Sequence, residues 1–170
     1  MRLDEKGRDL FDLKMSSAEF TKDIESQCNW FGCVPDSVFK QVLPKLKHWH
    51  LAPRENHLIG MAFGAKLAGQ KPAVLIQNSG IGLCLDALLG TFCLYNQGLL
   101  LVISNRGVLQ WEEIQHQDWG DITEPLLSVS KIKIISFDEE GIDGLNRAAK
   151  MAFENNEVVA FTIQRGNLDE

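Results

Sequence analysis

Two short apolar runs with a helical segment between them constrain the fold more than any other feature of the chain. Residues 73–77 (AVLIQ) and 99–104 (LLLVIS) are almost entirely apolar, which is typical of strands buried on both faces of a sheet. Residues 82–95 between them have a helical pattern. A helix that joins two such strands makes a right-handed crossover, so the pattern favours a parallel sheet with helices on both faces.

The rest of the chain continues this alternation. We expect further strands at residues 31–34, 48–51, 132–136 and 158–164, and further helices at residues 17–30, 55–68, 119–129 and 139–154. The polar stretch 105–118 has no clear period and is expected to form a long loop. The sequence therefore predicts a single three-layer α/β domain over residues 16–170, with a mostly parallel six-stranded sheet, preceded by an N-terminal arm or helix over residues 1–15.

One further helix is expected directly after the first strand. Asp36 or Ser37 can cap its start, and Val38 and Val42 begin an apolar stripe at helical spacing. Pro44 should kink this helix or end it early, because proline lacks the backbone N–H that a helix interior needs.

Charge and cysteine usage exclude several classes of function. The chain has 17 Lys and Arg against 23 Asp and Glu, a net charge of −6 without a basic cluster, so we expect no nucleic-acid partner. The most apolar stretch, residues 81–103, is interrupted by polar residues, so we expect no membrane span. The charged N-terminus and the absence of close cysteine pairs predict a cytoplasmic protein with free thiols and no metal site. The cysteines are Cys28, Cys33, Cys84 and Cys93.

Polar side chains occur where the expected strands end. In a parallel sheet these ends meet at one edge, where ligands usually bind. Glu55 starts a helix after a strand, and a first-turn glutamate is also favoured by the helix dipole alone. Gln77, Asn78, Ser79 and Gly80 end the most buried strand. They form either a site for a polar small molecule or a simple turn in which Ser79 caps the next helix.

Several short pieces occur in a fixed order along the chain. They are residues 32–37 (GCVPDS), Glu55-Asn56 with Gly60 and Ala65, Lys71-Pro72, residues 77–82 (QNSGIG), Tyr95, Arg106-Gly107, and Gln115-His116 with Gly120. In this order and spacing, the chain resembles the pyrimidine-binding domain of thiamine-diphosphate-dependent decarboxylases, nearest to those that act on 3-sulfopyruvate and 3-phosphonopyruvate. The resemblance covers about residues 19–164.

The resemblance implies roles for the residues at the strand ends. Glu55 matches the glutamate that hydrogen-bonds the N1′ atom of the cofactor's aminopyrimidine, and the Gln77, Asn78, Ser79 and Gly80 segment would face the cofactor. A partly desolvated carboxylate suits this role, because desolvation raises its pKa and lets it share a proton.

The resemblance also implies which residues meet the substrate. Asp36 and His116 match positions that supply a proton during the reaction, although Asp36 suits a helix cap equally and His116 a surface position. Arg106 would hold the second anionic group of the substrate, or else form a salt bridge with Glu112 or Glu113. The remaining substrate contacts would come from Ser37, Asn78 and Ser79.

The resemblance finally implies a partner. The chain lacks the Gly-Asp-Gly…Asn motif that binds Mg²⁺ and the cofactor diphosphate in this family, so a separate beta-type subunit would supply it, in an assembly of at least α2β2. The expected reaction converts 3-sulfopyruvate, a small anionic 2-oxo acid, to sulfoacetaldehyde and CO₂, as in coenzyme M biosynthesis. Three alternatives stay open: phosphonopyruvate decarboxylation, carboligation, and a non-catalytic binding domain. Leu83 follows Gly82 where the family often has asparagine, so the anionic group of the substrate is the least constrained feature.

Overall fold

The two apolar runs form neighbouring strands at the centre of one parallel sheet. The structure, a computed structural model, describes residues 13–109 and 112–169, so the predicted arm over residues 1–15 lies almost wholly outside the described residues. The strands are β1 (Trp30–Cys33), β2 (His50–Leu51), β3 (Pro72–Gln77), β4 (Leu99–Ser104), β5 (Lys133–Ser136) and β6 (Val158–Ile163). Their order in the sheet is β2-β1-β3-β4-β6-β5, and every pair is parallel. This confirms the predicted sheet.

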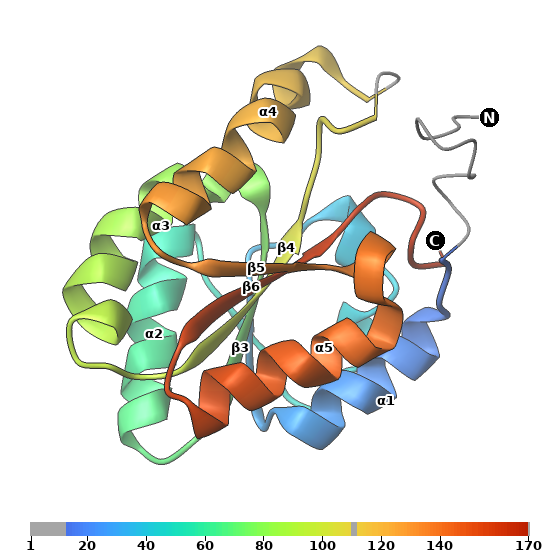
Figure 1. Cartoon of the computed structure of the whole chain (residues 1–170). Coiled ribbons are helices and arrows are strands. Elements are labelled where there is room, and N and C mark those ends of the chain that lie inside the picture. Colours follow the sequence, from blue (N-terminus) through green and yellow to red (C-terminus); the bar gives the residue numbers. More distant parts are fainter. Residues whose placement is uncertain (1–12, 110–111, 170) are drawn as a thin grey trace.

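Helices cover both faces of the sheet, as predicted (Figure 1). The α-helices are α1 (Ser17–Gln27), α2 (Glu55–Leu67), α3 (Ile81–Leu88), α4 (Ile114–Val129) and α5 (Phe137–Glu154). Helices α1 and α5 pack on one face, and α2, α3 and α4 on the other. A π-helical turn, η4 (Leu89–Cys93), extends α3 toward β4.

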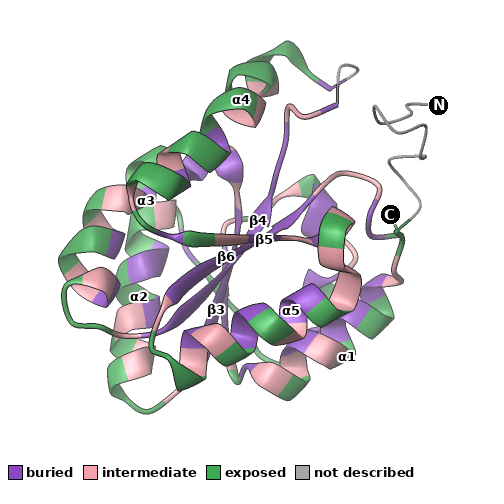
Figure 2. Cartoon of the chain, viewed as in Figure 1, coloured by how far each residue is buried: buried purple, intermediate pink, exposed green. Residues whose placement is uncertain are grey.

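Alternation along the central strands divides the core into two halves. In β3, Leu75 belongs to the core under α1 and α5, whereas Val74 belongs to the core under α2 and α3. Every residue of β4 and of β6 is buried, while the outer helix faces are exposed (Figure 2). Burial on both faces therefore explains why these strands are continuously apolar.

The prediction of one regular helix after β1 is wrong. The segment forms two short 3-10 helices, η1 (Ser37–Phe39) and η2 (Leu43–Lys45), because Pro44 cannot donate a hydrogen bond inside an α-helix. Val42 still packs into the core with no exposed surface. The apolar stripe thus marked the buried side correctly without specifying the helix type.

Two helix starts also differ from the prediction. Helix α4 begins at Ile114, five residues earlier than expected, so the loop after β4 is shorter than residues 105–118. Helix α5 begins at Phe137 with Ser136 at the N-cap position, and Gly141 (φ 56°) kinks it. The Asp138 carboxylate, in the first turn of this helix, accepts a hydrogen bond from the Asn167 side chain at 2.7 Å.

Candidate active site at the carboxyl edge of the sheet

The segments that leave β1, β3, β4 and β6 lie at one edge of the sheet, because all the strands run in the same direction. From β1 the chain moves outward to β2, and from β3 it moves the opposite way to β4. Such a reversal between adjacent strands is where open α/β sheets usually bind ligands. The predicted site residues lie on these segments and at the starts of α2 and α4.

Glu55 is the first residue of α2 and packs directly against Gly80. A Cβ atom added to Gly80 would lie 2.4 Å from Glu55 Cγ and 2.8 Å from Glu55 Oε1, so any larger residue at position 80 would displace the glutamate. The side chain is half-buried. Within the described ranges, the Glu55 carboxylate makes no hydrogen bond and no ion pair. It is therefore a carboxylate held in place by packing and left available to a donor from outside the chain.

Cys84 lies beside this carboxylate on α3. Burial, with a smaller contribution from the charge of Glu55, raises the pKa of the Cys84 thiol to about 12. The thiol is thus protonated and apolar near neutral pH.

Gln77 and His116 meet across the site. The Gln77 side-chain nitrogen lies 2.9 Å from His116 Nδ1. Because an amide nitrogen donates, Nδ1 accepts this bond, and the neutral imidazole then carries its proton on Nε2. His116 lies in the first turn of α4 and not in a loop as predicted. The helix orients its ring.

Gly107 allows α4 to approach the loop after β4. Its φ of 86° is in the region that favours glycine, and a Cβ atom there would lie 1.8 Å from the carbonyl oxygen of His116. The Gly107 N–H donates to Glu112 Oε2 at 2.6 Å. The position of His116 thus depends on a backbone contact that only glycine permits.

Asn78 is a buried link between three elements. Its side-chain nitrogen lies 3.1 Å from Asn105 Oδ1, 2.8 Å from the Arg106 carbonyl oxygen and 3.0 Å from Thr123 Oγ1. Its Oδ1 atom is buried and has no partner among the described residues. Asn78 therefore joins the ends of β3 and β4 to α4.

The neighbours of Asn78 differ in part from the prediction. Ser79 is half-buried, and Gly80 rather than Ser79 occupies the N-cap position of α3. Sequence reasoning did not identify Asn105 and Thr123 as partners of Asn78. The position of Asn105 directly after a buried strand is the one signal that pointed to it.

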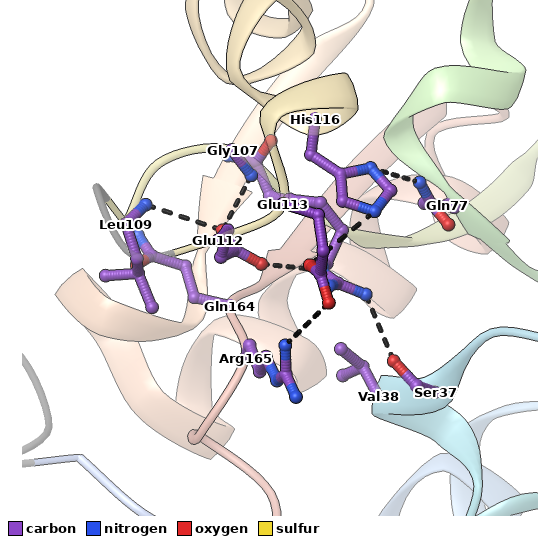
Figure 3. A network of polar contacts seen from close by, with 12 residues as sticks. Ser37, Val38, Gln77, Gly107, Leu109, Glu112, Glu113, His116, Gln164 and Arg165 are labelled. Atoms are coloured by element: carbon purple, nitrogen blue, oxygen red, sulfur yellow. Dashed lines mark hydrogen bonds and ion pairs between the residues drawn. The ribbon is translucent and has the colours of Figure 1, made fainter.

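A buried arginine, Arg106, organises the other side of the site, and Figure 3 shows its labelled partners Ser37, Glu112 and Glu113. Arg106 Nε donates to Glu112 Oε1 at 2.5 Å, Nη1 donates to Ser37 Oγ at 3.0 Å, and Nη2 donates to Glu113 Oε2 at 2.8 Å. Nη1 also lies 3.6 Å from Asp36 Oδ2. The structure thus brings together Asp36, Ser37 and Arg106, and Arg106 pairs with both glutamates that the sequence offered as partners.

The charges in this network stabilise one another. Burial disfavours the charged guanidinium, but the hydrogen bond and charge of Glu112, with Asp36 and Glu113, raise the pKa of Arg106 above its usual value. A hydrogen bond from its own backbone N–H, together with Arg106 and Arg165, lowers the pKa of Glu113. The Asp36 carboxylate also accepts the Val38 N–H at 2.8 Å, so the capping interpretation is confirmed for η1.

Two other kinds of feature are absent from the described residues. In residues 13–109 and 112–169, no three His, Cys, Asp or Glu side chains are grouped closely enough to hold a metal ion. Within those ranges no helix is long and apolar enough to cross a membrane. The four cysteines are free thiols, and burial raises the pKa of Cys33 to about 12.

Comparison with known proteins identifies the family. No family model matches the chain. The sulfopyruvate decarboxylase subunit alpha of Methanococcus maripaludis is 33% identical over 130 residues, which cover 73% of this chain and 77% of that protein. The chain belongs to the family of sulfopyruvate decarboxylase alpha subunits.

Two further members of this family match over shorter segments. The alpha subunit of Methanocaldococcus jannaschii is 43% identical over 82 residues, and that of Methanothermobacter thermautotrophicus is 39% identical over 54 residues. These alignments cover 48% and 33% of the two proteins, which is half of their length or less.

A solved structure shares the fold. Part of the 2-oxoglutarate:ferredoxin oxidoreductase of Magnetococcus marinus superposes with a TM-score of 0.69 over 90% of this chain and 29% of its own. The sequences are only 16% identical, so this likeness concerns the architecture alone.

Proposed function

We propose that this chain is the alpha-type subunit of a two-component thiamine-diphosphate-dependent decarboxylase that converts 3-sulfopyruvate to sulfoacetaldehyde and CO₂. The observation that carries the proposal is the Glu55 carboxylate, which is packed against Gly80 at the carboxyl edge of the sheet and unpaired within the described residues. The names of the three relatives support the substrate. In this proposal residues 16–170 form the pyrimidine-binding domain.

The residues present fit an aminopyrimidine ring. A carboxylate without a protein partner can share a proton with a ring nitrogen, and the missing side chain at Gly80 leaves space that a Cβ atom would fill. Gln77, Asn78 and Ser79 supply polar groups beside that space. Thiamine diphosphate, when bound, supplies a nucleophilic carbon and an electron sink for decarboxylation.

Side chains of this protein would perform the remaining steps, which are proton transfer and orientation of the substrate. Glu55 holds a proton at its carboxylate and fixes the ring in position. His116 presents the proton on Nε2, with Nδ1 fixed by Gln77, and is the proton donor to the product together with Asp36. Arg106 and Ser37 orient the anionic substrate from the opposite side.

A beta-type partner completes the site in this proposal. It would bind Mg²⁺ and the diphosphate, since the described residues of this chain group no three metal-ligating side chains. An assembly of at least α2β2 would place the cofactor between the two kinds of subunit.

Reconstitution with the partner tests the proposal. The tagged chain is purified with the proteins that bind it, and sulfoacetaldehyde formation from 3-sulfopyruvate is measured with thiamine diphosphate and Mg²⁺. We expect turnover by the complex, none by the chain alone, and a decrease of about 10² to 10⁴ in Glu55→Gln, the usual contribution of a proton-transferring group. Glu124→Gln, at an exposed position of α4, should match the wild type. Activity of Glu55→Gln close to that of the wild type would refute the role of Glu55.

A further inference from the structure

A half-exposed carboxylate lies among three donors that come from three different segments. Glu113 Oε2 accepts a hydrogen bond from Arg106 Nη2 at 2.8 Å and lies 3.9 Å from His116 Nε2. Glu113 Oε1 lies 3.5 Å from Arg165 Nη1. Arg106 follows β4, His116 belongs to α4, and Arg165 follows β6. In Figure 3 dashed lines join the labelled side chains of His116 and Arg165 to Glu113.

Glu113 differs from the other groups that hold Arg106. The Glu112 side chain is completely buried, and its second oxygen accepts the backbone N–H of Gly107, so Glu112 is fixed. Glu113 is 50% exposed, and an exposed ion pair contributes little to stability. Glu113 also occupies the N-cap position of α4, yet its carboxylate caps no N–H of the first turn within the described residues. Among the described carboxylate partners of Arg106, Glu113 is the one whose departure does not leave a buried carboxylate without its guanidinium.

We propose that Arg106, Arg165 and His116 form a subsite for an anionic group of a ligand, and that the Glu113 carboxylate occupies this subsite until that group displaces it. The three donors suit a sulfonate, which offers three oxygens. The Arg106 guanidinium is fixed by Glu112, so its Nη2 edge keeps one direction. His116 Nε2 lies 3.9 Å from the same Glu113 oxygen, so it borders the group that replaces Glu113 before it donates its proton to the product. Assigning the anion to the sulfonate of 3-sulfopyruvate rests on the proposed function.

Exchange of one anion for another preserves the charge balance of the subsite. The donors keep a negative partner throughout, so they are never left unpaired. The released Glu113 carboxylate stays beside the N-terminus of α4, where the helix dipole favours negative charge. Glu113 therefore lowers the apparent affinity for the anion by competing for the same donors.

Binding of a simple sulfonate to the full chain tests this subsite without cofactor or partner. Methanesulfonate is titrated into the ¹⁵N-labelled chain at low ionic strength, and backbone amide shifts at Glu113, His116 and Arg165 report binding. Dimethyl sulfone, which has the same sulfonyl group without the charge, is the ligand control. Glu113→Gln removes the competing charge, and Glu124→Gln removes an equal charge elsewhere on α4. Arg165→Gln is combined with Glu113→Gln to remove a donor.

We expect Glu113→Gln to bind methanesulfonate about tenfold more tightly than the wild type and Glu124→Gln. The added Arg165→Gln change should abolish this gain, and dimethyl sulfone should cause no shifts at these residues. Equal affinity of the Glu113→Gln and Glu124→Gln variants would overturn the proposal, as would equal binding of dimethyl sulfone.

The two proposals can fail separately. If methanesulfonate binds as expected and the assembled complex does not turn over 3-sulfopyruvate, the subsite stands and the proposed function fails. If the complex is active while Glu113→Gln leaves methanesulfonate binding unchanged, the function stands and the subsite fails.

Discussion

The two sides of the candidate site are held in place by different forces. On the Glu55 side, packing positions the carboxylate, which rests on the backbone of Gly80 and has no polar partner in the described residues. On the Arg106 side, charge positions it: the buried guanidinium is bound by Glu112, Glu113 and Ser37.

This difference separates groups that stay available to a ligand from groups that stabilise the fold. A group held by packing keeps its hydrogen-bonding capacity for a ligand, and its loss should affect function more than folding. A buried charge that the protein itself neutralises contributes to the fold, because removing one partner leaves the other uncompensated. Substitutions on the Glu55 side should therefore affect function more than folding, and substitutions on the Arg106 side should affect folding more.

The largest effect on stability is expected from Arg106→Met. This change leaves the fully buried Glu112 carboxylate without its guanidinium, so the free energy of unfolding should fall by about 3–5 kcal/mol. Urea denaturation of the isolated chain measures it. Arg147→Met is the matched control, because the Arg147–Glu140 pair is exposed and should contribute at most about 1 kcal/mol. Equal losses in the two variants would show that the buried network does not stabilise the fold.

Gly80→Ala should reduce turnover strongly and change the free energy of unfolding little. The new methyl group would lie 2.4 Å from Glu55 Cγ, which is too close, and the flexible glutamate would turn away with little cost to folding. We expect turnover of the reconstituted complex to fall about 10- to 100-fold, since small misplacements of reacting groups have effects of this size. The free energy of unfolding should change by less than about 1 kcal/mol.

Gly64→Ala provides the control for this substitution in the unfolding measurement. Gly64 is an exposed residue of α2, and a Cβ atom there meets nothing within 4 Å, so alanine should stabilise the helix by about 0.5–1 kcal/mol. A Gly80→Ala chain that unfolds much more easily and keeps its turnover would contradict this account of the Glu55 side.

The smallest expected effect concerns Cys84, whose reactivity reports on the packing of the Glu55 side. With a pKa of about 12, only about one molecule in 10⁴ carries the reactive thiolate at pH 8. Labelling by a disulfide reagent should therefore be very slow and should rise with pH, while the half-buried Cys93 reacts first. Because the charge of Glu55 contributes to the raised pKa, Glu55→Gln should accelerate Cys84 labelling slightly. Mass spectrometry of labelled peptides measures both rates, and labelling of Cys84 as fast as a free peptide thiol would contradict the packing described here.

The same contrast explains what the sequence could predict. The apolar runs specified the central strands because burial on both faces leaves a local signal. Glu55 could be singled out as a candidate site residue from its position after a strand and from the family pattern around it. These features depend on short segments of the chain.

The remaining features depend on how distant segments meet. The bond from Asn78 to Thr123 joins residues 45 positions apart, and it exists because α4 crosses over the end of β3. The early start of α4 at Ile114 carries no apolar signal, because its first turn is fixed by Glu112 and by the backbone approach of Gly107. The convergence of Arg165 and Arg106 on Glu113 likewise follows from the order of β4 and β6 in the sheet.

An experimental structure of the assembled complex with thiamine diphosphate would test the central claim most directly. The decisive quantity is the distance from the Glu55 carboxylate to the N1′ atom of the aminopyrimidine. The proposal predicts a hydrogen bond, with a separation of about 2.6–3.2 Å, and a ring that lies against Gly80. A cofactor bound elsewhere, or a Glu55 carboxylate that faces solvent while another acid contacts N1′, would contradict it.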